Sequence, residues 1–151
     1  MAYEFVGRSD NWGIIDLATG AFSQTGNSGQ LLTGLGVGPG GLLYGGLFQG
    51  TTLYQVNPAN GSLTSVGTSG ISYNDFGSTT SGVYGFDGSA NLYSVNTTTG
   101  AATLIGSTGL SMAGTTGTST GSETLYFVNG SGNCTRSTPA QRRRRRSAIQ
   151  V

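Results

Sequence analysis

The sequence predicts an all-β protein made of repeated antiparallel units, and three observations support this prediction. A pattern of 18 residues occurs three times, over residues 12–29, 53–70 and 92–109, with starts 41 and then 39 residues apart. Glycines recur at fixed places within the copies, and apolar residues recur between them. Within each copy, large and small side chains alternate as they do in half-buried strands. A repeat of this period with strand-like copies indicates a repeat architecture.

Each copy is predicted to form a β-hairpin. In the third copy, residues 91–95 alternate like a strand, residues 96–100 form a turn motif, and residues 101–105 make the return strand. An Asp or Asn that opens the turn can accept a hydrogen bond from the backbone two residues on, and a closing glycine can adopt positive φ. We therefore expect a type I turn with a glycine bulge in each hairpin. The expected structural turn residues are Asp16, Gly20, Asn57, Gly61, Asn96 and Gly100.

A second hairpin is expected before each copy. Residues 42–45 and 83–86 are apolar and strand-like, and a further apolar stretch separates successive copies. Each period therefore contains about four short strands, which is the content of one β-propeller blade. We expect antiparallel four-stranded blades over residues 1–133, about three in number and incomplete, with a fourth copy starting at residues 123–133.

Two other all-β folds compete with the propeller. A Ser/Thr/Gly-rich β-solenoid would also repeat, but its coils are shorter, about 20 residues, and carry weaker hairpin signals. A β-sandwich is disfavoured because its strands need not repeat in sequence. The propeller is therefore the preferred fold.

The repeats resemble a known family. The copies LYQVNPANGSLTSVGTSG and LYSVNTTTGAATLIGSTG are similar to the LYxVDPxTGxxTxIGxTG blades of bacterial extracellular β-propellers, many of them domains of unknown function. The resemblance covers about residues 3–133 and implies propeller blades. It also implies an extracellular or cell-surface location for the full-length protein, although this chain shows no signal-peptide pattern. It implies no particular activity, because propellers host binding and catalysis alike.

The charge is divided between two parts of the chain. Residues 1–135 contain six acids and one base, whereas residues 136–151 contain six arginines, five of them consecutive. We expect residues 134–151 to form a basic, low-complexity, disordered tail.

The tail also carries a second hypothesis. Residues 125–133 align with residues 83–91, so a copy of LYSVNTTTG should follow, yet the sequence continues CTRSTPAQRRRRRSAIQV. A shifted reading frame takes the last base of one codon and the first two bases of the next. In that frame the genetic code permits L-Y-S-V-N after residue 133, and it permits the residues of the repeat at most later positions. Residues 134–151 are therefore hypothesised to be a frameshifted reading of a fourth copy, which the underlying DNA would test.

No catalytic, cofactor-binding or metal-ligating residue is predicted. The chain has no His, so the usual Ser-His-Asp triad is unavailable, and Asp75 and Asp87 are expected on loops. One acid or Asn per turn supplies too few oxygen ligands for calcium, so turn capping is the preferred interpretation of Asp16 and its equivalents. The repeated tyrosines are candidates for a sugar-binding surface, but their fixed places favour packing between blades. These tyrosines are Tyr44, Tyr54, Tyr84, Tyr93 and Tyr126.

Three functions compete. The first is a non-catalytic extracellular or cell-surface interaction module, a fragment of a longer protein, with a protein or carbohydrate ligand and no cofactor. The second is a fragment of a propeller enzyme, such as a hydrolase, lyase or quinoprotein, whose site lies in blades outside this chain. The third is binding of nucleic acid or an anionic surface through Arg142–Arg146, which the lack of interleaved aromatic residues disfavours.

Two expectations concern the membrane and self-association. No apolar run approaches the roughly 20 residues of a membrane span. Open blade edges present unpaired backbone groups, so self-association through them is expected.

Overall fold

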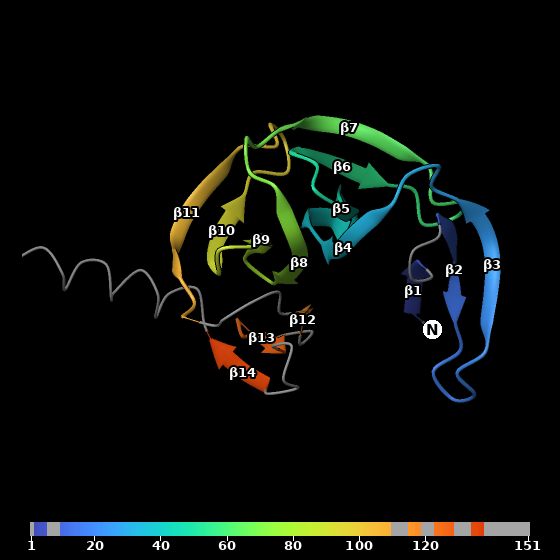
Figure 1. Ribbon diagram of the computed structural model, residues 1–151. Helices are drawn as coiled ribbons and strands as arrows, with labels where there is room; N and C mark the ends of the chain where they lie inside the picture. The colour runs from blue at the N-terminus through green and yellow to red at the C-terminus, as the bar shows by residue number, and fades with distance from the viewer. Residues whose placement is uncertain (1, 6–9, 110–114, 119–122, 129–133, 138–151) are drawn as a thin grey trace, which may run out of the picture.

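The computed structural model describes residues 2–5, 10–109, 115–118, 123–128 and 134–137. Within these residues the regular elements are strands, apart from the short 3-10 turn η1 (Pro39–Gly41). The strands form four antiparallel sheets that follow one another along the chain and lie in an arc (Figure 1). The all-β class is therefore confirmed. No helix in the described part of the chain is long and apolar enough to cross a membrane.

The second and third sheets are complete four-stranded units, as predicted for a blade. In both, neighbouring strands in the sheet are neighbours in the sequence. The second sheet contains β4 (Leu32–Val37), β5 (Leu43–Leu47), β6 (Thr52–Val56) and β7 (Leu63–Thr68). The third contains β8 (Tyr73–Thr79), β9 (Gly82–Asp87), β10 (Asn91–Val95) and β11 (Ala102–Ser107).

The first and fourth sheets each have three described strands. The first contains β1 (Ala2–Phe5), β2 (Asn11–Ile15) and β3 (Phe22–Asn27), and the fourth contains β12 (Thr115–Thr118), β13 (Leu125–Val128) and β14 (Cys134–Ser137). The structure thus has four sheets where about three blades and the start of another were expected.

Strand β14 begins where the repeat pattern ends in the sequence. Cys134 pairs with Val128, just as Leu92 of the third sheet pairs with Phe86. Residues 134–137 therefore occupy the third strand of the fourth sheet, although the tail was expected to begin at residue 134. The backbone of an extended strand accepts most side chains, so pairing continues where the apolar pattern has ended. The rest of the expected tail, including Arg142–Arg146, lies outside the described residues.

The repeat copies form the hairpins β2–β3, β6–β7 and β10–β11. In the second hairpin, the N–H of Gly61 donates to the carbonyl of Asn57 (2.8 Å), and the N–H of Ala59 donates to Asn57 Oδ1 (2.9 Å). Gly61 has a φ of 76°. This hydrogen bond closes a turn of five residues, from Asn57 to Gly61, whereas the expected type I turn has four. The left-handed conformation of Gly61 directs its N–H toward the carbonyl of Asn57.

The bulge lies in the return strand and not in the turn, where it was expected. In the second hairpin, Leu53 pairs with Gly67 and Tyr54 pairs with Ser65, which leaves Val66 without a pairing partner. The first and third hairpins shift register at the equivalent place, between Trp12 and Gly13 and between Leu92 and Tyr93. Bulges of this kind bend a strand and increase its twist, and here they recur once per hairpin.

Among the described residues, buried hydrophobic side chains form three core clusters, each between two neighbouring sheets. Alternation along a strand sends successive side chains to opposite faces, so one strand serves two clusters. Leu53 packs toward the third sheet, whereas Val56 packs toward the first. The first cluster contains Trp12, Leu32, Leu43 and Val56; the second Tyr44, Leu53, Tyr73, Phe76, Val83 and Val95; the third Tyr84, Phe86, Ala90, Leu92, Ile105, Leu125 and Phe127.

A hairpin turn also rests on the outer strand of the preceding sheet. A Cβ on Gly67 of β7 would lie 2.1 Å from the carbonyl oxygen of Thr99, and a Cβ on Gly26 of β3 would lie 2.1 Å from that of Asn60. The N–H of Asn27 donates to the same Asn60 oxygen (3.1 Å). Strands β3, β7 and β11 are edge strands of the first three sheets and lie along the outside of the arc (Figure 1).

Two tyrosines in the third sheet give a matched prediction. Tyr73 is fully buried against Phe76, with ring centroids 4.4 Å apart, and burial raises the pKa of its hydroxyl. The Ser69 side chain is near enough to oppose that rise in pKa, but the Tyr73 hydroxyl has no partner of hydrogen-bonding geometry within the described residues. Tyr93 instead donates to Asp87 Oδ2 (3.0 Å). Tyr73→Phe is expected to raise stability by about 1 kcal/mol, because a buried unsatisfied hydroxyl is removed. Tyr93→Phe is expected to lower it by about 1–2 kcal/mol, because a bond to a charged group is lost.

Thermal unfolding followed by circular dichroism checks both changes. For a chain of this size, 1 kcal/mol corresponds to a shift in Tm of about 3 °C. Equal shifts of the same sign for the two variants would show that the two hydroxyls have equivalent surroundings, contrary to the structure.

Candidate binding surface

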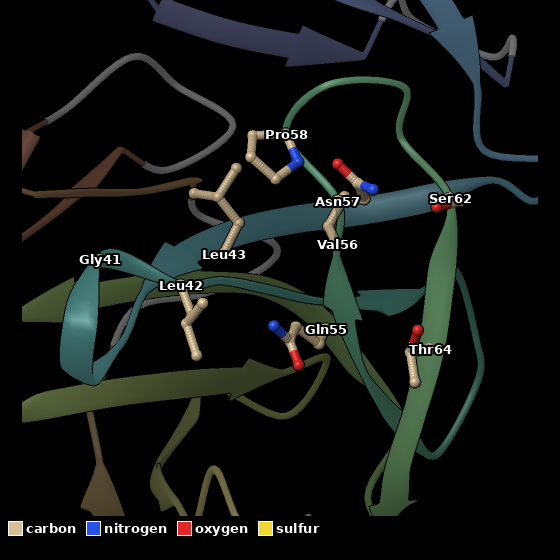
Figure 2. A pocket seen from close by; sticks show the side chains of 9 residues that line it. All are labelled: Gly41, Leu42, Leu43, Gln55, Val56, Asn57, Pro58, Ser62 and Thr64. Carbon is tan, nitrogen blue, oxygen red and sulfur yellow. The ribbon is translucent and has the colours of Figure 1, made fainter.

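A surface pocket of about 260 Å³ lies at one end of the second sheet (Figure 2). The turn between β4 and β5 forms one side, and the hairpin β6–β7 forms the other. Gln55 and Thr64, which pair across β6 and β7, line it together with the turn at Asn57. The full lining is Gly41, Leu42, Leu43, Gln55, Val56, Asn57, Pro58, Ser62 and Thr64.

The lining of this pocket is neutral. Leu42, Leu43, Val56 and Pro58 supply aliphatic surface, while the amides and hydroxyls supply hydrogen-bonding groups. Leu42 is 44% exposed at its rim. Carboxamides and hydroxyls can both donate and accept hydrogen bonds. Such a lining can hold a small neutral polar group by hydrogen bonds and aliphatic contact.

Asp87, at the end of β9, organises a turn. Its Oδ1 accepts from the N–H groups of Ser89 (2.9 Å) and Asn91 (2.8 Å), and its Oδ2 accepts from the Asn91 amide (3.0 Å) and the Tyr93 hydroxyl. Burial alone would raise the pKa of this carboxyl, but the bonds from Asn91, Tyr93 and Ser89 together outweigh burial and lower the pKa. Burial, followed by the neighbouring Asp87, raises the pKa of Tyr93. Asp87 was expected on a loop; it is the last residue of β9, and its side chain holds the turn that follows.

Asp75 was expected on a loop but lies inside strand β8, where it is 7% exposed. Its Oδ1 accepts from the N–H of Phe76 (2.7 Å), and a Cβ on Gly34 would lie 2.1 Å from that oxygen. Gly34 of β4 therefore leaves the space that the Asp75 carboxyl occupies. The polar residues around Asp75 resemble a loop sequence, but sheet pairing with β9 determines its conformation.

Glu123 joins the third sheet to the fourth. Its Oε2 accepts from the hydroxyl of Thr79 (2.9 Å), and its Oε1 accepts from the hydroxyl of Thr80. The hydroxyls of Thr80, Ser81 and Thr79 lower the pKa of this exposed carboxyl. Asp75, Asp87 and Glu123 thus all use carboxylate oxygens in bonds within the scaffold.

The six expected turn residues lie in three separate hairpins. The side-chain oxygens that could have bound calcium accept backbone N–H groups instead: Asp16 from Ala18 (2.8 Å), Asn57 from Ala59 (2.9 Å) and Asn96 from Thr98 (2.8 Å). Within the described residues, no three His, Cys, Asp or Glu side chains lie together as metal ligands would.

Two of the repeated tyrosines lie at interfaces between blades. Tyr44, Tyr84 and Tyr93 are buried, while Tyr54 and Tyr126 are partly buried. Tyr44 and Tyr84 belong to two different core clusters. They do not form one aromatic platform for a sugar.

The pocket-lining residues were not predicted from the sequence. Leu42 and Gln55 lie in the expected strands, but their meeting depends on how two turns are placed at one end of the sheet. The available signal was Pro58 in the second turn, where the first turn has Leu17 and the third has Thr97.

Comparison of the sequence with known proteins identifies no relative. No family model matches the chain, and no curated protein sequence matches it.

Comparison of the structure does find similar folds. The chain is similar to a chain in the crystal structure of a nidogen/laminin complex, with a TM-score of 0.64 and 11% identity over 87% of this chain and 55% of that one. It is also similar to PorZ, a surface component of the type-IX secretion system of Porphyromonas gingivalis. Here the TM-score is 0.52 and the identity 12%, over 91% of this chain and 20% of that one. A third similar structure is virginiamycin B lyase from Staphylococcus aureus. The TM-score is 0.51 and the identity 11%, over 94% of this chain and 50% of that one.

The fold is that of a β-propeller. The matched proteins share it, and the two complete sheets of this chain correspond to propeller blades. At these identities the likeness establishes the fold alone. The chain spans 55%, 20% and 50% of the lengths of these three solved chains.

Proposed function

We propose that this chain is a non-catalytic interaction module that works outside the cell or at its surface, with a protein or carbohydrate ligand. The observation that carries the proposal is the neutral pocket at the end of the second blade, rimmed by Leu42. A lining of amides, hydroxyls and aliphatic groups suits recognition of a neutral polar ligand. The pocket lining contains no carboxylate, imidazole, amine or thiol that could act as a general acid or base.

Two likenesses favour this class of function. One matched structure is a complex of nidogen with laminin, and another is a bacterial surface component. Both place a propeller in an interaction or surface setting, and the low charge of residues 1–135 suits an exported protein.

A ligand screen with matched variants tests the proposal. The chain is screened against an array of neutral oligosaccharides and a panel of purified surface and matrix proteins. Leu42→Asp and Gln55→Ala are expected to weaken binding of any hit at least tenfold, because one introduces a charge at the rim and the other removes an amide. Phe48→Asp is the control, since Phe48 is 56% exposed but does not line the pocket.

Two results would contradict the proposal. One is the absence of any hit that saturates, and the other is a hit whose affinity falls with Phe48→Asp but not with the two pocket variants. Melting curves of all three variants establish that they remain folded.

The second candidate function is part of a propeller enzyme, which the likeness to virginiamycin B lyase favours. The chain contains no His and no Lys, so a general base would have to be a carboxylate, a tyrosine or the single cysteine, or come from another part of a longer protein. Lyase turnover by this chain alone, lost on substitution of a carboxylate, would favour this candidate over the interaction module.

A further inference from the structure

Each interface between neighbouring blades is formed by two sets of side chains, and each set comes from the same positions of the repeat at every interface. The forward position, Trp12, Leu53 or Leu92, packs toward the following sheet and is fully buried. The backward position, Val56 or Val95, packs toward the preceding sheet. Trp12 and Val56 share one core cluster, and Leu53 and Val95 share the next. A forward residue of one blade therefore meets a backward residue of the next.

The first sheet has its backward positions open. Ile15 pairs with Phe22 across β2 and β3, as Val56 pairs with Leu63 in the second sheet. Val56 is 1% exposed and Leu63 packs against its cluster. Ile15 and Phe22 are only partly buried, and neither belongs to a core cluster of the described residues.

The fourth sheet has its forward positions open. Leu125 and Phe127 are fully buried toward the third sheet. Tyr126 and Cys134 occupy the places of Tyr84 and Leu92, which pack toward a following sheet. Here Tyr126 is only partly buried, and Cys134 is exposed.

We propose that a second copy of this chain covers these faces head to tail, with the forward face of the fourth sheet against the backward face of the first sheet of the other copy. The two faces differ, so the contact is heterologous. They carry opposite halves of the interface that this chain already forms three times. Two copies of this chain together have about the length of each of two solved chains with this fold, since one copy spans 55% and 50% of them. This contact is independent of the proposed ligand pocket.

Mixed-chain crosslinking tests the contact directly. The natural chain has its only cysteine at Cys134, on the forward face. A second chain carries Cys134→Ser and Ile15→Cys, so its only thiol is on the backward face. With a short bismaleimide, the mixture is expected to form crosslinked dimer at least fivefold above either chain alone, because like faces do not meet. An equal yield in all three samples would overturn the proposal.

A matched control separates face contact from pairing of outer edges. Leu104 lies on the outer strand β11 and is 36% exposed. A chain with Cys134→Ser and Leu104→Cys, mixed with the natural chain, should stay at background. Crosslinking at residue 104 equal to that at residue 15 would assign association to the outer edge and overturn the proposal.

Sedimentation velocity gives a readout without cysteines. The natural chain should sediment faster than a monomer, and Ile15→Arg should return it to the monomer, while Leu104→Arg should not. Circular dichroism establishes that both arginine variants keep their sheet content. A monomeric natural chain at all concentrations would also overturn the proposal.

Discussion

Replacement of Trp12 by alanine is expected to destabilise the protein by about 4 kcal/mol. Trp12 is fully buried in the cluster between the first and second sheets, and its Nε1 donates to the carbonyl of Pro58 (3.0 Å). The substitution leaves a cavity and an unpaired carbonyl at an interface that holds two blades together. Chemical denaturation followed by far-ultraviolet circular dichroism measures the loss, because Trp12 is the only tryptophan and its fluorescence disappears with it.

Trp12→Leu is the matched control for this prediction. Leu53 and Leu92 occupy the same repeat position and are fully buried there. Leucine should therefore restore at least half of the stability that alanine loses, since it fills part of the cavity without the hydrogen bond. If leucine and alanine cost the same, the indole bond rather than the repeated packing position would hold the first blade.

Replacement of Gly67 by alanine has the second large expected effect, a destabilisation of about 3 kcal/mol. The new Cβ would lie 2.1 Å from the carbonyl oxygen of Thr99, so the turn at residues 96–100 would have to move away from β7. Backbone, unlike the end of a flexible side chain, cannot yield without displacing the whole hairpin. The midpoint of denaturation measures the effect, and hydrogen exchange should increase at residues 96–100.

Gly88→Ala is the control for steric crowding. Gly88 lies in a turn of the same region of the chain, and a Cβ there would meet Asn74 only at 3.5 Å, an ordinary contact. The change is expected to stay within about 0.5 kcal/mol. A loss at Gly88 as large as that at Gly67 would show that the effect comes from glycine itself and not from the close approach of two blades.

The local structure of the hairpins was predictable because its causes lie within a few residues. The alternation in residues 91–95, the Asx oxygen at Asn96 and the left-handed glycine at Gly100 each act over distances that the sequence displays. The period then placed Leu53 and Leu92 at equivalent core positions. Trp12 aligns with these leucines in the first copy, and it is fully buried.

Features that depend on how two strands or two turns are placed against each other were not predictable. Asp75 has a loop-like local sequence, yet it lies within strand β8, where it pairs with β9, and Gly34 of the neighbouring sheet leaves room for its carboxyl. The bulge at Val66 arises from the register between β6 and β7, and periodicity within one strand contains no information on register. The pocket depends in the same way on the meeting of two turns.

The chain's own repeat thus determined the fold class, the hairpins and the identity of the core positions, because these follow from the period and from short-range backbone preferences. Only the tertiary structure decided what lies between the blades. It placed turns on outer strands at Gly26 and Gly67, extended the fourth sheet to Ser137, and left Ile15 and Cys134 on open faces. The contacts at Gly26 and Gly67 join residues of successive copies of the pattern, which one copy does not encode.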